Sequence, residues 1–132
     1  MTKGHPLIAI VDDDVSVRRA LKRLVRSLGM NAEIFASGQE FLDCIEALPS
    51  FRADCAILDV QMPGMNGLEV RERLALGGRP IPVIFITAHD DVGVRERALA
   101  SGAVAFVRKP FDDELLIKTL RAALLSEAAG GI

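Results

Sequence analysis

Five polar side chains stand at or close to the ends of short apolar runs: Asp12, Asp13, Asp59, Thr87 and Lys109. Carboxylates a few ångströms apart repel each other by about 4 kcal/mol per pair at an effective dielectric of about 20, so several stay ionised together only around a cation. Ligands that are all oxygen suit Mg²⁺, or Mn²⁺ in its place. With an ammonium and a hydroxyl beside it, such a group is suited to accept a phosphoryl group. The set therefore predicts a phosphoryl-transfer site, provided that the fold brings these residues together.

Apolar runs alternate with amphipathic stretches along the chain, which predicts strands and helices in succession. The runs that we interpret as strands are 7–11, 34–35, 55–58, 82–86 and 104–107. The stretches that we interpret as helices are 17–28, 37–48, 66–74, 91–101 and 112–124. Five such units are too few for an eightfold barrel, so we predict an α/β fold with an open, doubly wound parallel sheet and five helices.

Residues at the helix ends support these boundaries. Asp14 is expected to cap the first helix rather than to bind a metal. Ser37 with Glu40 has the spacing of a capping box, and Asn66 with Glu69 is placed to cap the third helix. The residues expected on the buried sides of the second and last helices are Phe41, Leu42, Ile45, Leu48, Leu115, Leu116, Leu120, Ala123 and Leu124.

In open parallel sheets, ligands bind beyond the carboxyl ends of the strands. Four of the five expected strands deliver polar residues to that edge, and the second strand, which we expect at the side of the sheet, does not. Taken alone, Asp59 could be a turn residue, Thr87 a strand-end hydroxyl and Lys109 a surface charge. Their occurrence together at the ends of neighbouring strands predicts a site instead.

The same residues lie in segments that resemble the response regulator receiver domain, the phosphoacceptor module of two-component signalling. The pattern Asp-x-x-Met-Pro-x-Met-x-Gly, at residues 59–67, is specific by itself. The other matching segments are 10–13, 86–88 and 109–111, and the resemblance covers about 7–125, with a tail at 126–132. Residues 87–92 and 102–104 resemble the branch that contains nitrogen-fixation transcriptional regulators.

The resemblance implies a single receiver domain over residues 1–132, with the flavodoxin-like (CheY-like) fold and the strand order 2-1-3-4-5. It implies that Asp59 is the phosphoacceptor and that Thr87 and Lys109 contact the phosphoryl group. In the family, the peptide bond before the residue that corresponds to Pro110 is cis.

The resemblance also implies the metal ligands. Asp13 would bind Mg²⁺ directly and Asp12 through water, with Asp59 and the backbone carbonyl of Gln61 as further ligands. Gln61 and His89 stand at positions that tune the lifetime of the aspartyl phosphate in this family.

The implied switch pairs Thr87 with Phe106, at a position where Tyr is commoner in the family. It would change the face formed by the fourth helix, the fifth strand and the last helix, through which such domains contact an output domain or a second copy. The implied phosphodonor is a phosphohistidine on a sensor histidine kinase or a histidine phosphotransfer protein. The first helix has a basic face that is either solvated or a contact surface for this donor: Arg18, Arg19, Lys22, Arg23 and Arg26.

Two alternatives remain open at this point. In a haloacid-dehalogenase-type phosphatase, Asp12 would be the nucleophile and Asp14 the acid, because residues 11–16 partly fit the first motif of that class. Such an enzyme also needs a late acidic pair, for which 90–91 or 112–113 could stand. A receiver-like interaction module without phosphorylation is the second alternative, and the complete set of acidic, hydroxyl and ammonium residues argues against it.

Composition excludes several other classes. The chain has 132 residues, a formal net charge of −2 and no Trp or Tyr, which argues against direct binding of nucleic acid. No apolar run approaches the roughly 20 residues of a membrane span, and the first residues lack the layout of a signal peptide. Two cysteines cannot form a disulfide framework, so a reduced, cytoplasmic setting is expected.

Overall fold

A five-stranded parallel sheet forms the centre of the protein, which we describe from a computed structural model over residues 5–78, 80–88 and 92–130. The strands are β1 (Leu7–Val11), β2 (Asn31–Phe35), β3 (Cys55–Asp59), β4 (Val83–Thr87) and β5 (Ala105–Arg108). Their order in the sheet is β2-β1-β3-β4-β5, and every neighbouring pair is parallel. The doubly wound sheet and its implied strand order are therefore confirmed.

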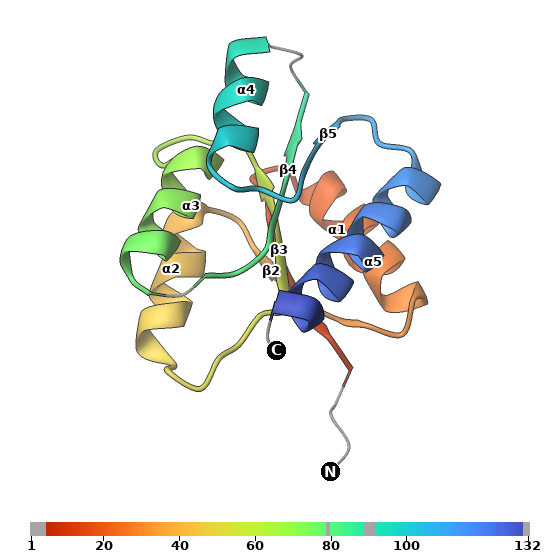
Figure 1. Ribbon diagram of the computed structural model, residues 1–132, viewed down its shortest axis with the longest axis horizontal. Helices are drawn as coiled ribbons and strands as arrows, with labels where there is room; N and C mark the ends of the chain where they lie inside the picture. The colour runs from red at the N-terminus through yellow and green to blue at the C-terminus, as the bar shows by residue number, and fades with distance from the viewer. Residues whose placement is uncertain (1–4, 79, 89–91, 131–132) are drawn as a thin grey trace.

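Helices cover both faces of this sheet. They are α1 (Val15–Ser27), α2 (Gly38–Ala47), α3 (Gly67–Leu76), α4 (Val92–Ala100) and α5 (Asp113–Gly130). Figure 1 shows α1 and α5 on one face, and α2, α3 and α4 on the other. In the described ranges, no helix combines the length and the apolar character that a membrane crossing requires.

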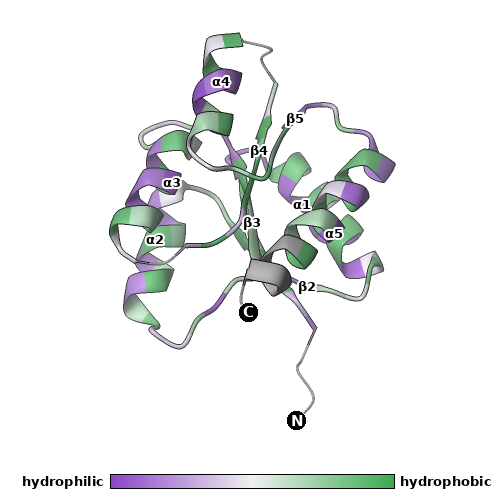
Figure 2. Cartoon of the chain, viewed as in Figure 1, coloured by the Kyte–Doolittle hydropathy of each residue, from purple (hydrophilic) through white to green (hydrophobic). Residues whose placement is uncertain are grey.

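The core has two halves because successive side chains of a strand point to opposite faces of the sheet. On the α2 and α3 side, Val11, Leu58 and Phe85 pack with Phe41 and Val70. On the α1 and α5 side, the alternate strand residues pack with helix residues that include Leu21, Leu116 and Leu120. Both faces are buried, which explains the nearly continuous apolar runs of β1, β3 and β4. Figure 2 shows hydrophobic residues gathered along these central strands.

Side chains cap the N-termini of three helices as expected, except that one of the two expected capping boxes is incomplete. The carboxylate of Asp14 accepts hydrogen bonds from the backbone N–H groups of residues 16 and 17, at 2.8 and 3.4 Å. Asn66 and Glu69 form a complete capping box, with both hydrogen bonds at 2.9 Å. Ser37 accepts from the N–H of Glu40, but the Glu40 carboxylate accepts from the N–H of residue 36, so the expected capping box is incomplete there.

Three expectations about elements were wrong in detail. The second strand begins at Asn31 rather than at Ile34, because its backbone pairs with β1 from Leu7 onward while part of its outer side stays exposed. Leu48 is 53% exposed because it follows the last residue of α2, at a position where the backbone is no longer helical. Leu115 is 50% exposed, and the next residue of α5, Leu116, takes the buried position.

Candidate functional site

The ends of four neighbouring strands bring the expected site residues to one edge of the sheet. Asp12 follows β1, Asp59 is the last residue of β3, Thr87 is the last residue of β4, and Lys109 follows β5. Asp12, Asp59 and Thr87 are almost completely buried, with 0%, 2% and 0% of their surface exposed, whereas Asp13 is exposed. The edge therefore has a buried polar floor and one solvent-facing carboxylate.

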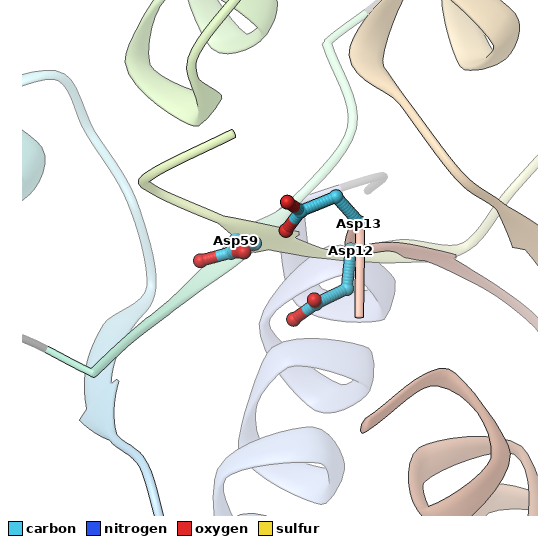
Figure 3. A group of neighbouring side chains, drawn as sticks. All are labelled: Asp12, Asp13 and Asp59. Carbon is cyan, nitrogen blue, oxygen red and sulfur yellow. The ribbon is translucent and has the colours of Figure 1, made fainter. Parts of the chain in front are cut away.

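Three carboxyl groups converge at this edge. Asp12, Asp13 and Asp59 each offer one oxygen atom, and these atoms all lie within 4.8 Å of one another. Figure 3 shows the three side chains gathered where two adjacent strands end, with the carboxyl groups of Asp12 and Asp13 on the side that faces Asp59. At such separations the carboxylates repel each other, so the group requires positive charge to stay ionised.

Lys109 supplies one positive charge. Its Nζ lies 2.9 Å from Oδ2 of Asp12 and 3.3 Å from Oδ2 of Asp59. Burial opposes the charge of Lys109, but the hydrogen bond and the negative charge of Asp12, together with Asp59, outweigh it and raise the pKa of the ammonium. Lys109 is therefore a fixed cation between two buried carboxyl groups. The peptide bond between Lys109 and Pro110 is cis, as the resemblance implied.

One ammonium does not balance the acidic group. Burial, and then the neighbouring charge of Asp12, raise the pKa of Asp59 to about 7, although Lys109 and the N–H of Gln61 act in the opposite direction. That N–H lies 3.3 Å from Oδ1 of Asp59. The ionised form of Asp59 is thus disfavoured in the protein alone, and an added cation would favour it.

The acidic group fits a divalent cation that prefers oxygen. Oδ1 of Asp12 accepts a hydrogen bond of 2.8 Å from the N–H of Asp14. Oδ2 of Asp12 is buried and, apart from the ammonium of Lys109, has no partner in the described part of the chain. Three carboxylates, one of them open to solvent, form a donor set of the kind that binds Mg²⁺ or Mn²⁺.

Two of the remaining expected residues, Thr87 and Phe106, belong to the neighbouring strands β4 and β5. The carbonyl oxygen of Thr87 accepts a hydrogen bond of 2.7 Å from the N–H of Lys109, which ties the end of β4 to the chain after β5. Phe106 lies opposite Phe85 in the sheet and is partly buried. The expectation for His89 concerns a residue outside the described ranges.

One contact of the site was not anticipated from the sequence. Nη1 of Arg18 donates a hydrogen bond of 2.7 Å to the carbonyl oxygen of Asp12. From the sequence, Arg18 was grouped with the other basic residues of the first helix and was given no separate role. Its position in the first turn of α1, four residues after Asp14, is the signal that could have singled it out.

Comparison with known proteins identifies the family. Residues 8–121 match the family model described as the response regulator receiver domain. The chain belongs to the response regulator receiver domain family. This receiver domain is 43% identical over 124 residues to the response regulator protein TmoT of Ectopseudomonas mendocina, a match that covers 94% of the chain and 55% of TmoT. It is 38% identical over 123 residues to the transcriptional regulatory protein FixJ of Bradyrhizobium diazoefficiens, covering 93% of the chain and 58% of FixJ.

A solved structure agrees with these sequence matches. A response regulator receiver protein from Burkholderia phymatum is 61% identical, with a TM-score of 0.82, and the match covers 90% of this chain and 94% of that one. The chain spans little more than half the length of the curated relatives named above. The family expected from the sequence is confirmed, and a FixJ-type regulator is among the relatives. The two alternatives are not favoured, and Asp12, the nucleophile in one of them, is completely buried between the N–H of Asp14 and the ammonium of Lys109.

Proposed function

We propose that this receiver domain accepts a phosphoryl group on a carboxylate oxygen of Asp59. The donor would be a phosphohistidine on a sensor histidine kinase or on a histidine phosphotransfer protein. An oxygen of Asp59 attacks the phosphorus atom, a P–O bond forms and the P–N bond breaks. The electron pair of that bond returns to the imidazole nitrogen. The observation that carries this proposal is the position of Asp59, which ends the central strand β3 within 3.3 Å of the ammonium of Lys109 and beside two further carboxyl groups.

The neighbouring residues have separate roles in this proposal. Lys109, held by Asp12, presents a positive charge to the oxygens of the incoming phosphoryl group, and the hydroxyl of Thr87 donates a hydrogen bond to it. Asp12, Asp13, Asp59 and the backbone carbonyl of Gln61 would hold Mg²⁺ or Mn²⁺. When bound, that ion neutralises charge on the carboxylates and on the phosphoryl oxygens. Arg18 positions the backbone of Asp12 through its hydrogen bond to the carbonyl oxygen.

The proposed output is a change in the face formed by α4, β5 and α5. The hydroxyl of Thr87 would move toward the phosphoryl group, and the ring of Phe106 would turn into the space beside β4. Residues 1–132 would act as one receiver domain with its core at about 7–125, and the changed face would contact an output domain or a second copy. Gln61 and His89 would set the rate at which the aspartyl phosphate hydrolyses. We propose a cytoplasmic setting for this exchange.

Labelling with a small phosphodonor tests the proposal. The wild-type protein, incubated with acetyl phosphate and Mg²⁺, should gain the mass of one phosphoryl group, and peptide mapping should place it on Asp59. Asp59→Asn should remain unlabelled. Asp43→Asn, which changes an exposed carboxylate on α2, should be labelled like the wild type. Labelling of the Asp59→Asn variant at the wild-type rate, or a label found on Asp12, would contradict the assignment.

A further inference from the structure

A cavity of about 520 Å³ lies between α3 and the C-terminal end of α4, apart from the acidic site. Figure 1 shows these two helices on the same face of the sheet. Its lining includes four charged side chains and one hydroxyl: Glu69, Arg71, Glu72, Arg97 and Ser101. A volume in this range is typical of sites for small molecules.

Arg71 is the residue that sets this cavity apart. Its Nε is inaccessible to solvent, and among the described residues this atom has no hydrogen-bond partner and no acidic side chain forms an ion pair with Arg71. The guanidinium extends to the turn that follows α4, since a Cβ atom at Gly102 would lie 3.2 Å from Nη2 of Arg71. Arg71 as a whole is half-buried, and charged groups that are removed from water are normally paired, so an unpaired guanidinium at this position is unusual.

The two acidic side chains that line the cavity form no ion pair with Arg71 in the described part of the chain. The carboxylate of Glu69 accepts the hydrogen bond from the N–H of Asn66 that completes the capping box. Glu72 lines the same cavity but is exposed, and it pairs with neither arginine in the part of the chain that the structure describes. Arg97, in the last turn of α4, brings a second guanidinium to the cavity. Two cations from two helices thus line one cavity, and neither forms an ion pair with an acidic side chain of the described residues.

We infer that this cavity binds a small oxyanion, namely phosphate or the phosphate group of a small molecule, between Arg71 and Arg97. A guanidinium group offers parallel N–H donors that match two oxygens of a phosphate, and such charge-assisted hydrogen bonds are stronger than neutral ones. The anion would supply the missing partner of Arg71. It would also join α3 to α4 and stabilise the present position of α4.

Amide NMR of the whole domain tests this inference, with inorganic phosphate as the probe. Phosphate is titrated into the ¹⁵N-labelled protein in buffer free of divalent metal, with sodium chloride adjusted to keep the ionic strength constant. The amide signals of Arg71, Ser101 and Gly102 should shift and reach saturation. Signals of Asp13 and Lys109 report separately on any binding at the acidic site.

Matched variants identify the side chains responsible. Arg71→Gln should weaken phosphate binding by about tenfold, as expected for the loss of a charge-assisted contact. Arg97→Gln changes an exposed residue, so it tests the same site without disturbing the interior, and it should also weaken binding. Arg73→Gln removes the same charge from α3 outside this cavity and should bind phosphate as the wild type does. Shifts that do not saturate, shifts confined to Asp13 and Lys109, or equal affinities in all three variants would overturn the inference.

Discussion

The ammonium of Lys109 lies 3.3 Å from the carboxylate of Asp59, although the two residues belong to the ends of β5 and β3, which are not adjacent in the sheet. The side chain of Lys109 passes the end of β4 and also reaches Asp12, 2.9 Å away at the end of β1. One cation therefore connects the ends of strands on both sides of β4. This connection makes Lys109 a structural counter-charge, and under the proposed function its ammonium would contact a phosphoryl group carried by Asp59.

Removal of this cation should affect both stability and phosphorylation. Lys109→Met leaves two buried carboxyl groups without their counter-charge, which should lower the free energy of unfolding of the metal-free protein by roughly 1–3 kcal/mol. Labelling by acetyl phosphate should also slow by about tenfold or more. Urea denaturation at about pH 8 measures the first effect and intact mass the second. Lys118→Met, at an exposed position of α5, is the matched control and should change neither. Equal behaviour of the two variants would contradict the role of Lys109.

The pKa of Asp59 predicts an unusual pH dependence. The folded protein holds the proton of Asp59 up to about pH 7, whereas the unfolded chain releases it near 3.8. Because the folded state binds this proton more tightly, Asp59 contributes stability below about pH 4 that is lost as the pH rises through about 7. Without metal, Asp59→Asn should therefore be more stable than the wild type at about pH 8, by on the order of 1 kcal/mol or more, with a much smaller difference at about pH 4.

Urea denaturation in the presence of a chelator, at several pH values, measures this difference. Asp43→Asn, exposed on α2, should follow the wild-type curve throughout. A constant difference between wild type and Asp59→Asn across the whole pH range would show that Asp59 is not the group responsible.

Binding of Mg²⁺ should stabilise the fold by mass action. At a metal concentration about 100 times the dissociation constant, the free energy of unfolding should rise by about 2.7 kcal/mol. Asp13→Asn should weaken this effect, because Asp13 is the exposed carboxylate of the group. Asp14→Asn is the matched control, because it removes the same charge from the adjacent residue. Asn and Asp cap helices about equally well, so this variant should keep the Mg²⁺ effect. Thermal denaturation over a Mg²⁺ titration measures the effect, and a midpoint that never changes would exclude the metal site.

The elements of the site could be predicted from the sequence better than the elements at its margins. The long apolar runs of β1, β3 and β4 follow from burial on both faces, and the residues at their ends are the ones that converge. The second strand was placed too late because its exposed side carries residues such as Glu33, so its apolar signal is short. Leu48 and Leu115 were expected inside because periodicity does not show where a helix ends or how wide its buried side is.

Other features depend on three-dimensional contacts that no local pattern contains. The strand order followed from the resemblance to a family and not from periodicity. The different exposures of Asp12 and Asp13, consecutive in the chain, arise because one faces the floor of the site and the other the solvent. Nothing local in the sequence distinguishes Arg71 from Arg73 on the same helix, because the approach of its guanidinium to the turn at Gly102 arises only in the folded chain.

The basic face of α1 should contribute to recognition of the phosphodonor. The helix contains no acidic residue, and Arg19, Lys22, Arg23 and Arg26 line one surface depression next to each other. Arg18 is not suitable for substitution because it bonds to Asp12. The double variant Arg19→Glu with Arg23→Glu should slow transfer from the partner kinase by about tenfold at low salt through the loss of electrostatic attraction.

Two controls accompany this experiment. Labelling by acetyl phosphate should be unchanged in the double variant, because the acidic site is intact. Charge reversal at two exposed positions elsewhere, Arg52→Glu with Arg73→Glu, should leave transfer from the kinase nearly unchanged. Equal slowing with the kinase and with acetyl phosphate would point to a damaged site, and equal slowing by both double variants would point to net charge rather than to α1.

The conformational response should depend on Thr87 in a graded way. Shifting an equilibrium from 1:99 to 99:1 requires about 5.5 kcal/mol, more than the roughly 1.5–3 kcal/mol of one charge-assisted hydrogen bond. Lys109 and the surrounding loops must supply the remainder, so Thr87→Ala should reduce the response without preventing phosphorylation. Thr87→Ser keeps the hydroxyl and should respond nearly as the wild type does.

Amide NMR with and without a beryllofluoride mimic of the phosphoryl group measures this response. In the wild type, signals along α4 and at Phe106 should shift, since the guanidinium carbon of Arg95 lies 5.7 Å from the centre of the Phe106 ring and couples α4 to β5. Thr87→Ala should show smaller shifts at those positions while the signals next to Asp59 still change. Shifts restricted to the neighbours of Asp59 in the wild type would contradict the switch, because the signal would then not reach the face formed by α4, β5 and α5, and the domain would store phosphoryl groups without transmitting a conformational change.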